Sequence, residues 1–303
     1  MDVSIIIVNY NTKNLIENCI NSIYAHTTGL KFEIIVSDNN SNDGSVEMIK
    51  ESFPNVVLIE NDENLGFGRA NNKGLAVASG KYIFYLNSDT ILLNNAIKIF
   101  FDYFEKHNKE NIGALGCNLQ NKNGETIHSF GQIIPLKKRL KTLFHTLLGI
   151  SKDTVKYFFT HKKEAIKIEH QQNFTTGEVP YITGADLFVK NNDFAKYDER
   201  YFMYNEEVDL QLQMQKANQK SIIIEGPQII HLEGGSTEKK LYKVFYLSSS
   251  GNQQLFLSYV QFYSKNEHRP FLLILLKLVI FLIWINPYLI KNTKKNIPRL
   301  LKS

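Results

Sequence analysis

The chain has 303 residues, of which 43% are hydrophobic and 21% charged, so a folded core of one large or two ordinary domains is expected. The net charge of +5 is mild and Lys and Arg are spread along the chain, which argues against a nucleic-acid partner. Cys19 and Cys117 stand far apart without metal-ligand spacing. A disulfide scaffold or structural zinc site is therefore not expected, and the composition fits a reducing cytoplasm.

Apolar runs alternate with helical patterns through the first third of the chain. The runs expected as strands are residues 3–9, 32–37, 56–60 and 82–87. This alternation predicts an α/β fold with a doubly wound, mostly parallel sheet and flanking helices. Asn11 or Thr12 is expected to cap the helix after the first strand. No basic segment precedes the first strand, so no secretory signal is expected.

Polar clusters follow three of these strands: one begins at Asn9, one at Asp38, and one contains Asp89. With strand order 3-2-1-4, the first and fourth strands are neighbours and a nucleotide can bind at the switch point between them. Asp38 could then accept a hydrogen bond from a base or ribose, and Asp89 could face a diphosphate through Mg²⁺ or Mn²⁺. The alternative for Asp89 is an ordinary helix-capping carboxylate.

The segment from Asn64 to Asn72 opens a helix with Gly66, Gly68 and Arg69. It lacks the spacing of a dinucleotide fingerprint. Its glycines could let the backbone approach a ligand closely, with Arg69 near phosphate. Alternatively, Arg69 is a solvated helix residue.

Three carboxylates, Glu206, Glu207 and Asp209, lie within four positions at the start of a later helix. Acidic residues in a first turn stabilise a helix through its dipole, so capping is one reading. Three together beside aromatic residues exceed what capping needs, which favours a catalytic role. His231 ends a further strand and precedes Gly234 and Gly235; a histidine there is either structural or part of a ligand site.

Two segments differ from the α/β pattern. Residues 132–176 contain the basic amphipathic stretch 137–148, which fits either a membrane surface or a helical lid. Residues 271–290 form an apolar run with Lys277 inside it, followed by basic residues. We expect a helix in the membrane interface, with Lys277 reaching toward water. The alternative is a buried helix packed on the catalytic domain.

Seven segments in this order resemble a known family. They are residues 4–11, 36–45, 64–68, 86–90, 183–185, 206–210 and 231–236. The chain resembles the family 2 glycosyltransferases of the GT-A fold, particularly the rhamnosyltransferase-like branch of bacterial polysaccharide synthesis. The resemblance covers about residues 2–265.

The resemblance implies inverting transfer of a sugar from a nucleoside-diphosphate donor. Asp38 would hold the nucleobase in a pocket lined by Val8 and Tyr10. Asn87, Ser88 and Asp89 stand at the family's Asp-x-Asp motif, with Asn87 in place of the first Asp.

The same resemblance assigns the metal and the base. Asp89 and His231 would be protein ligands of Mn²⁺ or Mg²⁺. Glu207 would be the base that deprotonates the acceptor, with Glu206 and Asp209 as alternatives one register step away.

The expected organisation is a GT-A domain over residues 1–265, with 132–176 as an insert or lid, and a membrane-associating helix and basic tail over 266–303. The expected acceptor is a saccharide or lipid-linked saccharide, and the expected location is the cytoplasmic face of the inner membrane, peripheral or anchored by the C-terminal helix. The alternative function is a non-catalytic, sugar-nucleotide-binding scaffold, which the substitution at Asn87 keeps open. A nucleotidyltransferase is disfavoured because residues 9–13 contain no glycine.

Overall fold

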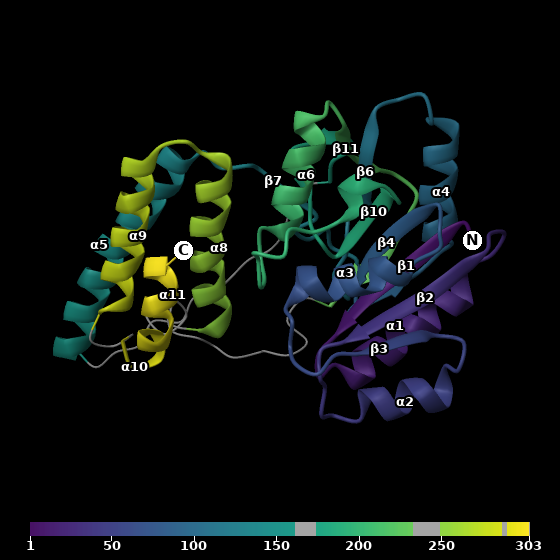
Figure 1. The fold of residues 1–303 in the computed structure, drawn as a ribbon, viewed down its shortest axis with the longest axis horizontal. Coiled ribbons are helices and arrows are strands. Elements are labelled where there is room, and N and C mark those ends of the chain that lie inside the picture. The colour runs from purple at the N-terminus through teal and green to yellow at the C-terminus, as the bar shows by residue number, and fades with distance from the viewer. Residues whose placement is uncertain (161–173, 233–248, 287–289, 303) are drawn as a thin grey trace. The chain divides into compact units, whose positions relative to one another are not determined.

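The computed structural model describes residues 1–160, 174–232, 249–286 and 290–302 (Figure 1). Its contacts divide the chain into two compact units. The sheet unit comprises residues 1–133, 170–202 and 206–238, and the helical unit comprises 134–169, 203–205 and 239–303. Residues 134–169, within the expected insert, therefore share a unit with the C-terminal segment.

The sheet unit contains all of the strands that the structure describes. They are β1 (Val3–Asn9), β2 (Phe32–Asp38), β3 (Val57–Glu60), β4 (Tyr82–Asn87), β5 (Thr90–Leu92), β6 (Ile112–Cys117), β7 (Phe130–Gly131), β8 (Gly177–Val179), β9 (Tyr181–Ile182), β10 (Asp186–Lys190), β11 (Lys220–Ile224) and β12 (Ile229–His231). Its helices are α1 (Lys13–His26), α2 (Ser45–Ser52), α3 (Phe67–Val77), α4 (Ala96–Lys106), the short η1 (Asp193–Ala195) and α6 (Glu206–Lys216).

The main sheet has eight strands in the order β3-β2-β1-β4-β10-β6-β11-β8. The predicted order 3-2-1-4 is confirmed, and the pairs β3–β2, β2–β1 and β1–β4 are parallel. Beyond β4, the strand β10 runs antiparallel to both β4 and β6, while β6 and β11 are again parallel. The sheet is mixed and mostly parallel, and its switch point lies between β1 and β4.

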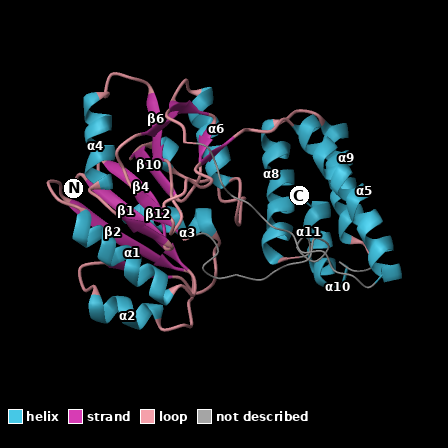
Figure 2. Cartoon of the chain, turned by 180° about the vertical axis from the view of Figure 1, so that it is seen from behind, coloured by secondary structure: helices cyan, strands magenta, loops and turns pink. Residues whose placement is uncertain are grey.

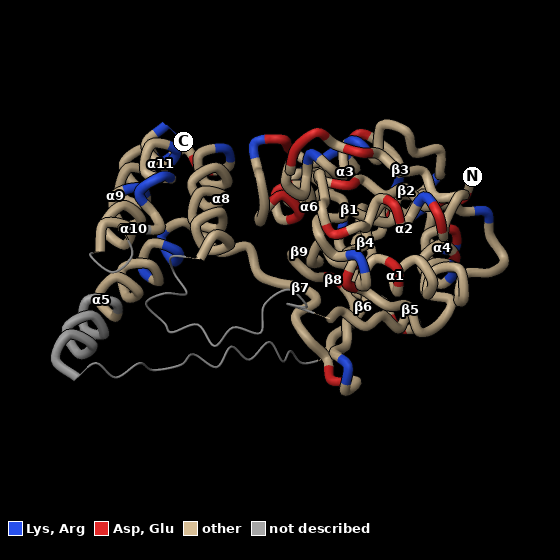
Figure 3. Tube along the Cα trace, turned by 90° about the horizontal axis from the view of Figure 1, so that it is seen from below, with Lys and Arg blue, Asp and Glu red and all other residues tan. Residues whose placement is uncertain are grey.

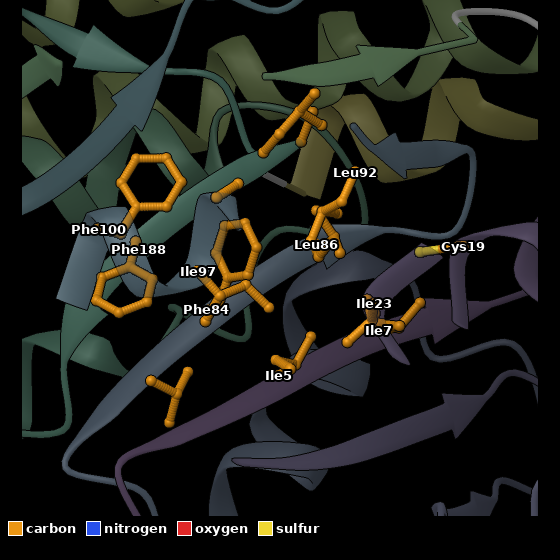
Figure 4. Close-up of a cluster of buried hydrophobic side chains, with 14 of the residues drawn as sticks. Ile5, Ile7, Cys19, Ile23, Phe84, Leu86, Leu92, Ile97, Phe100 and Phe188 are labelled. Carbon is orange, nitrogen blue, oxygen red and sulfur yellow. The ribbon is translucent and has the colours of Figure 1, made fainter. Parts of the chain in front are cut away.

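Helices lie on both sides of the main sheet (Figure 2), and alternation along the central strands builds a core on each of its faces. Ile5 of β1 and Phe84 of β4 pack with α1 and α4, as Figure 4 shows. Ile6 and Tyr85, one position later in each strand, pack on the other face with α6 and residues of α3. This three-layer core holds the carboxyl ends of β1 and β4 rigidly side by side.

The helical unit consists of α5 (Leu136–Thr160), α8 (Ser250–Asn266), α9 (Pro270–Trp284), α10 (Ile290–Thr293), the short η2 (Lys294–Asn296) and α11 (Ile297–Lys302). α9 packs against α5, α8 and α11. Trp284 is buried, with its ring 6.4 Å from that of Phe256 in α8.

The C-terminal apolar run forms a shorter helix than residues 271–290 would allow. α9 has 15 residues, so it is about 22 Å long, against the roughly 30 Å of a bilayer's hydrocarbon core. Within the described ranges, no helix is both long and apolar enough to cross a membrane.

Candidate functional site

A hydrogen-bond network joins the polar residues that follow β1, β2 and β4. The register pairs Asn9 with Asp38 across β1 and β2, and Asn9 Nδ2 donates to Asp38 Oδ1 at 2.6 Å. Thr12 Oγ1 donates to Asn9 Oδ1 at 2.6 Å and is hydrogen-bonded to the Ser88 hydroxyl, whose Oγ lies 3.0 Å away. Thr12 is the N-cap residue of α1, one of the two predicted positions, but its side chain makes no cap bond. Its hydroxyl connects the loops after β1 and β4 instead.

Asp38 and Tyr10 differ in how they could meet a nucleotide. Asp38 is buried, and its other oxygen accepts from the backbone N–H of Ser41 at 2.8 Å, so both oxygens already have protein donors. Tyr10 is 49% exposed at the end of β1, and Val8 is half-buried beside it. The structure gives Asp38 the role of shaping the loop, and direct nucleobase contact by Asp38 stays a prediction.

Asp89 and His231 come together although 141 residues separate them in the chain. β12 pairs antiparallel with β5 so that His231 faces Thr90, and Leu232 N–H donates to the Asp89 carbonyl. His231 Nε2 lies 3.1 Å from Asp89 Oδ1 and 3.4 Å from Asn87 Nδ2. Asp89 and His231 therefore lie side by side, as two ligands of one ion must, and their role as metal ligands stays a prediction.

An imidazole nitrogen and a carboxylate oxygen 3.1 Å apart suit Mn²⁺ or Mg²⁺ as a partial ligand set. No cluster of three or more His, Cys, Asp or Glu side chains that could hold a metal occurs in the part of the chain that the structure describes. The protein's own contribution would therefore be the pair Asp89 and His231, with the remaining positions left to substrate and water. Gly234 and Gly235 lie outside the described residues.

The three acidic residues at the start of α6 differ in how far they are buried. Glu206 and Asp209 are buried, whereas Glu207 is partly exposed. Although part of the Glu207 residue is exposed, protein surrounds its carboxyl group, and this loss of water raises its pKa to about 7 against the opposing effect of the backbone N–H groups at the helix start. Asp209 accepts from Gln213 Nε2 at 3.3 Å. Burial raises the pKa of Tyr201, and the nearby charge of Asp209 raises it further. Glu207 is thus the most accessible acid of the three.

Gln211 has a role that the sequence did not reveal. It is fully buried, its Oε1 accepts from the Ile182 N–H at 2.8 Å, and its Nε2 donates to the Ile182 carbonyl at 2.8 Å and to the Glu207 carbonyl at 3.1 Å. These bonds fix the first turn of α6 against β9. Gly184 lies close to the same turn, because a Cβ placed there would be 3.8 Å from Glu207 Cβ. In the sequence, Gln211 falls on the same helix face as the apolar Val208 and Met214, and this pattern could have indicated that Gln211 is a buried polar residue.

The glycines before α3 have a structural explanation. Gly66 has φ +82° and a Cβ there would lie 2.0 Å from the carbonyl oxygen of Phe202, whose carbonyl also accepts from Phe67 N–H. A side chain at Gly68 would press on Tyr197. Because the Phe202 backbone approaches so closely, a residue with a side chain does not fit at position 66. Contact between Gly66 and a ligand stays a prediction.

Arg69 is exposed on α3, and its Nε donates to the Glu199 carbonyl at 2.8 Å. The side chain is thus tied to the chain segment that precedes α6. Contact between Arg69 and a phosphate stays a prediction.

Asp186, at the start of β10, is a buried carboxyl to which the sequence assigned no role. Its Oδ2 accepts from Cys117 N–H at 2.7 Å, and among the described residues its Oδ1 has no hydrogen-bond partner. Burial raises the pKa of Asp186 to about 7, partly offset by the bonds from Cys117 and by the charge of His231. A carboxyl group next to the Asp89–His231 region is therefore held largely neutral below neutral pH.

Comparison with known proteins agrees with this architecture. The chain is 25% identical to the N-acetylglucosaminyl-diphospho-decaprenol L-rhamnosyltransferase of Mycobacterium tuberculosis over 218 residues, which cover 67% of each protein. It is 33% identical over 132 residues to the poly(ribitol-phosphate) beta-glucosyltransferase of Bacillus spizizenii, covering 42% of this chain and 20% of that protein.

Solved structures share the fold at low sequence identity. The mannosyltransferase PcManGT of Pyrobaculum calidifontis, solved with GDP-Man and Mn²⁺, superposes with a TM-score of 0.54 at 14% identity, covering 99% of this chain and 75% of that one. TarS residues 1–349 of S. aureus, solved with UDP, superpose with a TM-score of 0.51 at 15% identity, covering 77% and 60%.

The glycosyl transferase family 2 model matches residues 4–169, just over half of the chain. This span contains the network after β1, β2 and β4 together with Asp89. The rhamnosyltransferase match extends over a larger part of the chain. The chain therefore belongs to glycosyltransferase family 2, and it is of the rhamnosyltransferase-like type.

Proposed function

We propose that this protein is an inverting, metal-dependent glycosyltransferase. Its donor is a nucleoside-diphosphate sugar, and its acceptor is a saccharide or lipid-linked saccharide in cell-surface polysaccharide synthesis. The observation that carries the proposal is the pair Asp89–His231, whose side chains lie 3.1 Å apart at the carboxyl end of β4 in a family 2 chain. Ligands of open α/β sheets bind at this edge, beside the switch point.

Asp89 Oδ1 and His231 Nε2 are the groups that would hold the divalent ion. When bound, Mn²⁺ or Mg²⁺ would supply positive charge against the leaving diphosphate. Asn87, 3.4 Å from His231 Nε2, adds an uncharged amide where the family's motif has a first carboxylate. Asp89 and His231 would therefore supply the protein's metal ligands, and loss of either residue should weaken metal binding.

Glu207 is our proposed base. In a single displacement, the acceptor hydroxyl gives its proton to the Glu207 carboxylate while its oxygen bonds to the anomeric carbon. The bond from that carbon to the diphosphate oxygen breaks, and the nucleoside diphosphate leaves. A pKa of about 7 allows Glu207 to be ionised at neutral pH and still bind a proton strongly. Its partial exposure, compared with buried Glu206 and Asp209, leaves it open to an acceptor.

The proposal places the acceptor at a membrane. The mycobacterial relative's name specifies a decaprenol-linked substrate, and the helical unit carries an apolar helix with basic neighbours. The location that fits both is the cytoplasmic face of the inner membrane, with peripheral attachment.

The test is a screen of nucleotide sugars for release of nucleoside diphosphate, with and without Mn²⁺. Wild type should release diphosphate from one or a few donors only with metal, and Asp89→Ala should abolish the release. Asp102→Ala is the matched control, because Asp102 is an exposed carboxylate on α4 that pairs with Lys98 at the surface. Donor binding without release under every condition would instead identify a sugar-nucleotide-binding scaffold. Metal-independent release, unchanged in Asp89→Ala, would contradict the proposed site.

A further inference from the structure

One side of α9 is apolar and open to solvent. Along the helix and its C-terminal cap, large apolar side chains recur at helical spacing with exposed fractions from 36% to 75%. We call this set the α9 stripe; it consists of Phe271, Ile274, Leu275, Leu278, Leu282 and Ile285. Phe144 and Leu148 add two more exposed apolar side chains, one turn apart on α5, which packs along α9.

Packing inside the helical unit does not explain the α9 stripe. The side of α9 that faces α5, α8 and α11 buries its own set of apolar residues, namely Leu276, Val279, Ile280, Ile283 and Trp284. A surface helix of a water-soluble unit normally carries polar residues on its other side. Exposed apolar surface of this extent marks an interaction site.

The helical unit as a whole carries many more basic than acidic residues along its helices (Figure 3). From residue 250 to residue 302, Glu267 is the one acidic side chain against eight basic ones. The basic residues are Lys265, Arg269, Lys277, Lys291, Lys294, Lys295, Arg299 and Lys302. The start of α5 adds Lys137, Lys138, Arg139 and Lys141.

We infer that the α9 stripe is the surface by which the protein docks on an anionic lipid bilayer. α9 would lie in the plane of the interface, with the stripe among the acyl chains and the Lys and Arg side chains against the headgroups. This inference rests on the proposed function and deepens it, because docking on a bilayer would bring the enzyme to a lipid-linked acceptor. α9 has 15 residues and is about 22 Å long, a length that fits a helix lying in the plane of the interface.

Charge complementarity favours lipid over a second copy of the chain. A second copy docked on the stripe would bring its own basic helical unit against this one, and like charges repel. An anionic leaflet attracts each Lys or Arg near its surface. The combination of an apolar stripe with a one-sided basic charge fits lipid and opposes self-association.

The first experiment measures binding of the full-length chain to vesicles of phosphatidylcholine mixed with anionic phosphatidylglycerol. Ile274→Gln/Leu278→Gln should weaken binding by about 10–100-fold, because two side chains of the stripe lose their apolar contact with lipid. Both positions are exposed, so the fold should be retained, as thermal unfolding would verify. Val77→Gln/Leu93→Gln is the matched control, because these residues are 51% and 40% exposed on the sheet unit. Equal vesicle binding by both double variants and wild type would overturn the inference.

The second experiment separates charge from apolar contact and lipid from a second copy. Lys294→Gln/Lys295→Gln should weaken binding to the anionic vesicles and leave the weaker binding to pure phosphatidylcholine unchanged; Lys31→Gln/Lys73→Gln is the control on the sheet unit. Sedimentation velocity without lipid should show no dimer. A wild-type dimer that Ile274→Gln/Leu278→Gln dissociates would overturn the inference and make the stripe an interface between copies.

Donor chemistry distinguishes failure of the docking surface from failure of the proposed function. The double variant Ile274→Gln/Leu278→Gln should release nucleoside diphosphate from a water-soluble donor as wild type does. Loss of vesicle binding with intact release supports the docking surface. Vesicle binding by a wild-type protein that releases no diphosphate would refute the proposed function and leave the surface standing.

Discussion

Replacing Gln211 with Leu tests whether the start of α6 is held in place by one buried amide. Gln211 makes two 2.8 Å bonds to the backbone of Ile182 and one 3.1 Å bond to the Glu207 carbonyl. Leu has a similar volume and fills the space, so the change removes hydrogen bonds without leaving a large cavity. The N–H and carbonyl of Ile182 would remain buried without their partner.

The magnitude follows from those two groups. A buried donor or acceptor left unsatisfied costs about 1–3 kcal/mol, so the loss is roughly 2–6 kcal/mol before the gain from burying an apolar side chain. We expect a net destabilisation of about 2–4 kcal/mol. The first turn of α6, which carries Glu207, should also lose its fixed position against β9. We therefore expect kcat to fall by about 10–100-fold with little change in the KM for donor, because misplacement of a base affects the chemical step most.

The assay combines thermal unfolding with steady-state kinetics and a pH profile of kcat. The control is Gln215→Leu, one turn later on α6, because Gln215 donates to a single carbonyl, that of Pro180, and is partly exposed. The control should cost less stability and leave kcat within about twofold of wild type. If Gln211→Leu were as stable as wild type, the energetic argument would fail. If stability fell while kcat and its pH profile stayed unchanged, Gln211 would be a structural residue without a role in positioning Glu207.

Three further predictions each concern a single residue. Gly66→Ala should destabilise the fold by about 2 kcal/mol or more in urea unfolding, because its Cβ would lie 2.0 Å from the Phe202 carbonyl oxygen; unchanged stability would show that this loop repacks easily. His231→Ala should raise the Mn²⁺ concentration needed for half-maximal activity by about 10–100-fold in a metal titration, and an unchanged titration would exclude His231 as a ligand. The activity of wild type should rise with pH up to about 7 and then level off, because Glu207 must be deprotonated to act and its pKa is raised to about 7; a profile flat from pH 5 to 8 would contradict this.

The first half of the sheet could be predicted because its signals are local. The buried runs of β1 and β4 are mostly apolar, and their order follows from the rules for parallel connections. The antiparallel insertion of β10 between β4 and β6 could not be predicted in the same way. Its apolar residues fit a strand in either direction, and its pairing depends on contacts with strands far away in the chain.

The site shows the same division. The convergence of Asp89 and His231 was predicted because each ends a short apolar run at a known position in a family motif. The position of Thr12 at the N-cap of α1 was predicted correctly, but its hydroxyl makes no cap bond and instead contacts Asn9 and Ser88, partners that the sequence does not indicate. Gln211 was missed because its place on an apolar helix face indicates burial but does not identify its partners, which are backbone groups of Ile182.

The most direct test of the central claim is the single-turnover rate of Glu207→Gln with the donor identified by the screen. Glutamine keeps the size of the side chain and removes its basicity, so the rate should fall by about 10²–10⁴-fold while donor affinity is nearly unchanged. The rise of activity with pH toward neutrality should also disappear in this variant. Near-normal turnover by Glu207→Gln, together with loss of activity in Glu206→Gln or Asp209→Asn, would contradict the assignment and move the base to the neighbouring acid.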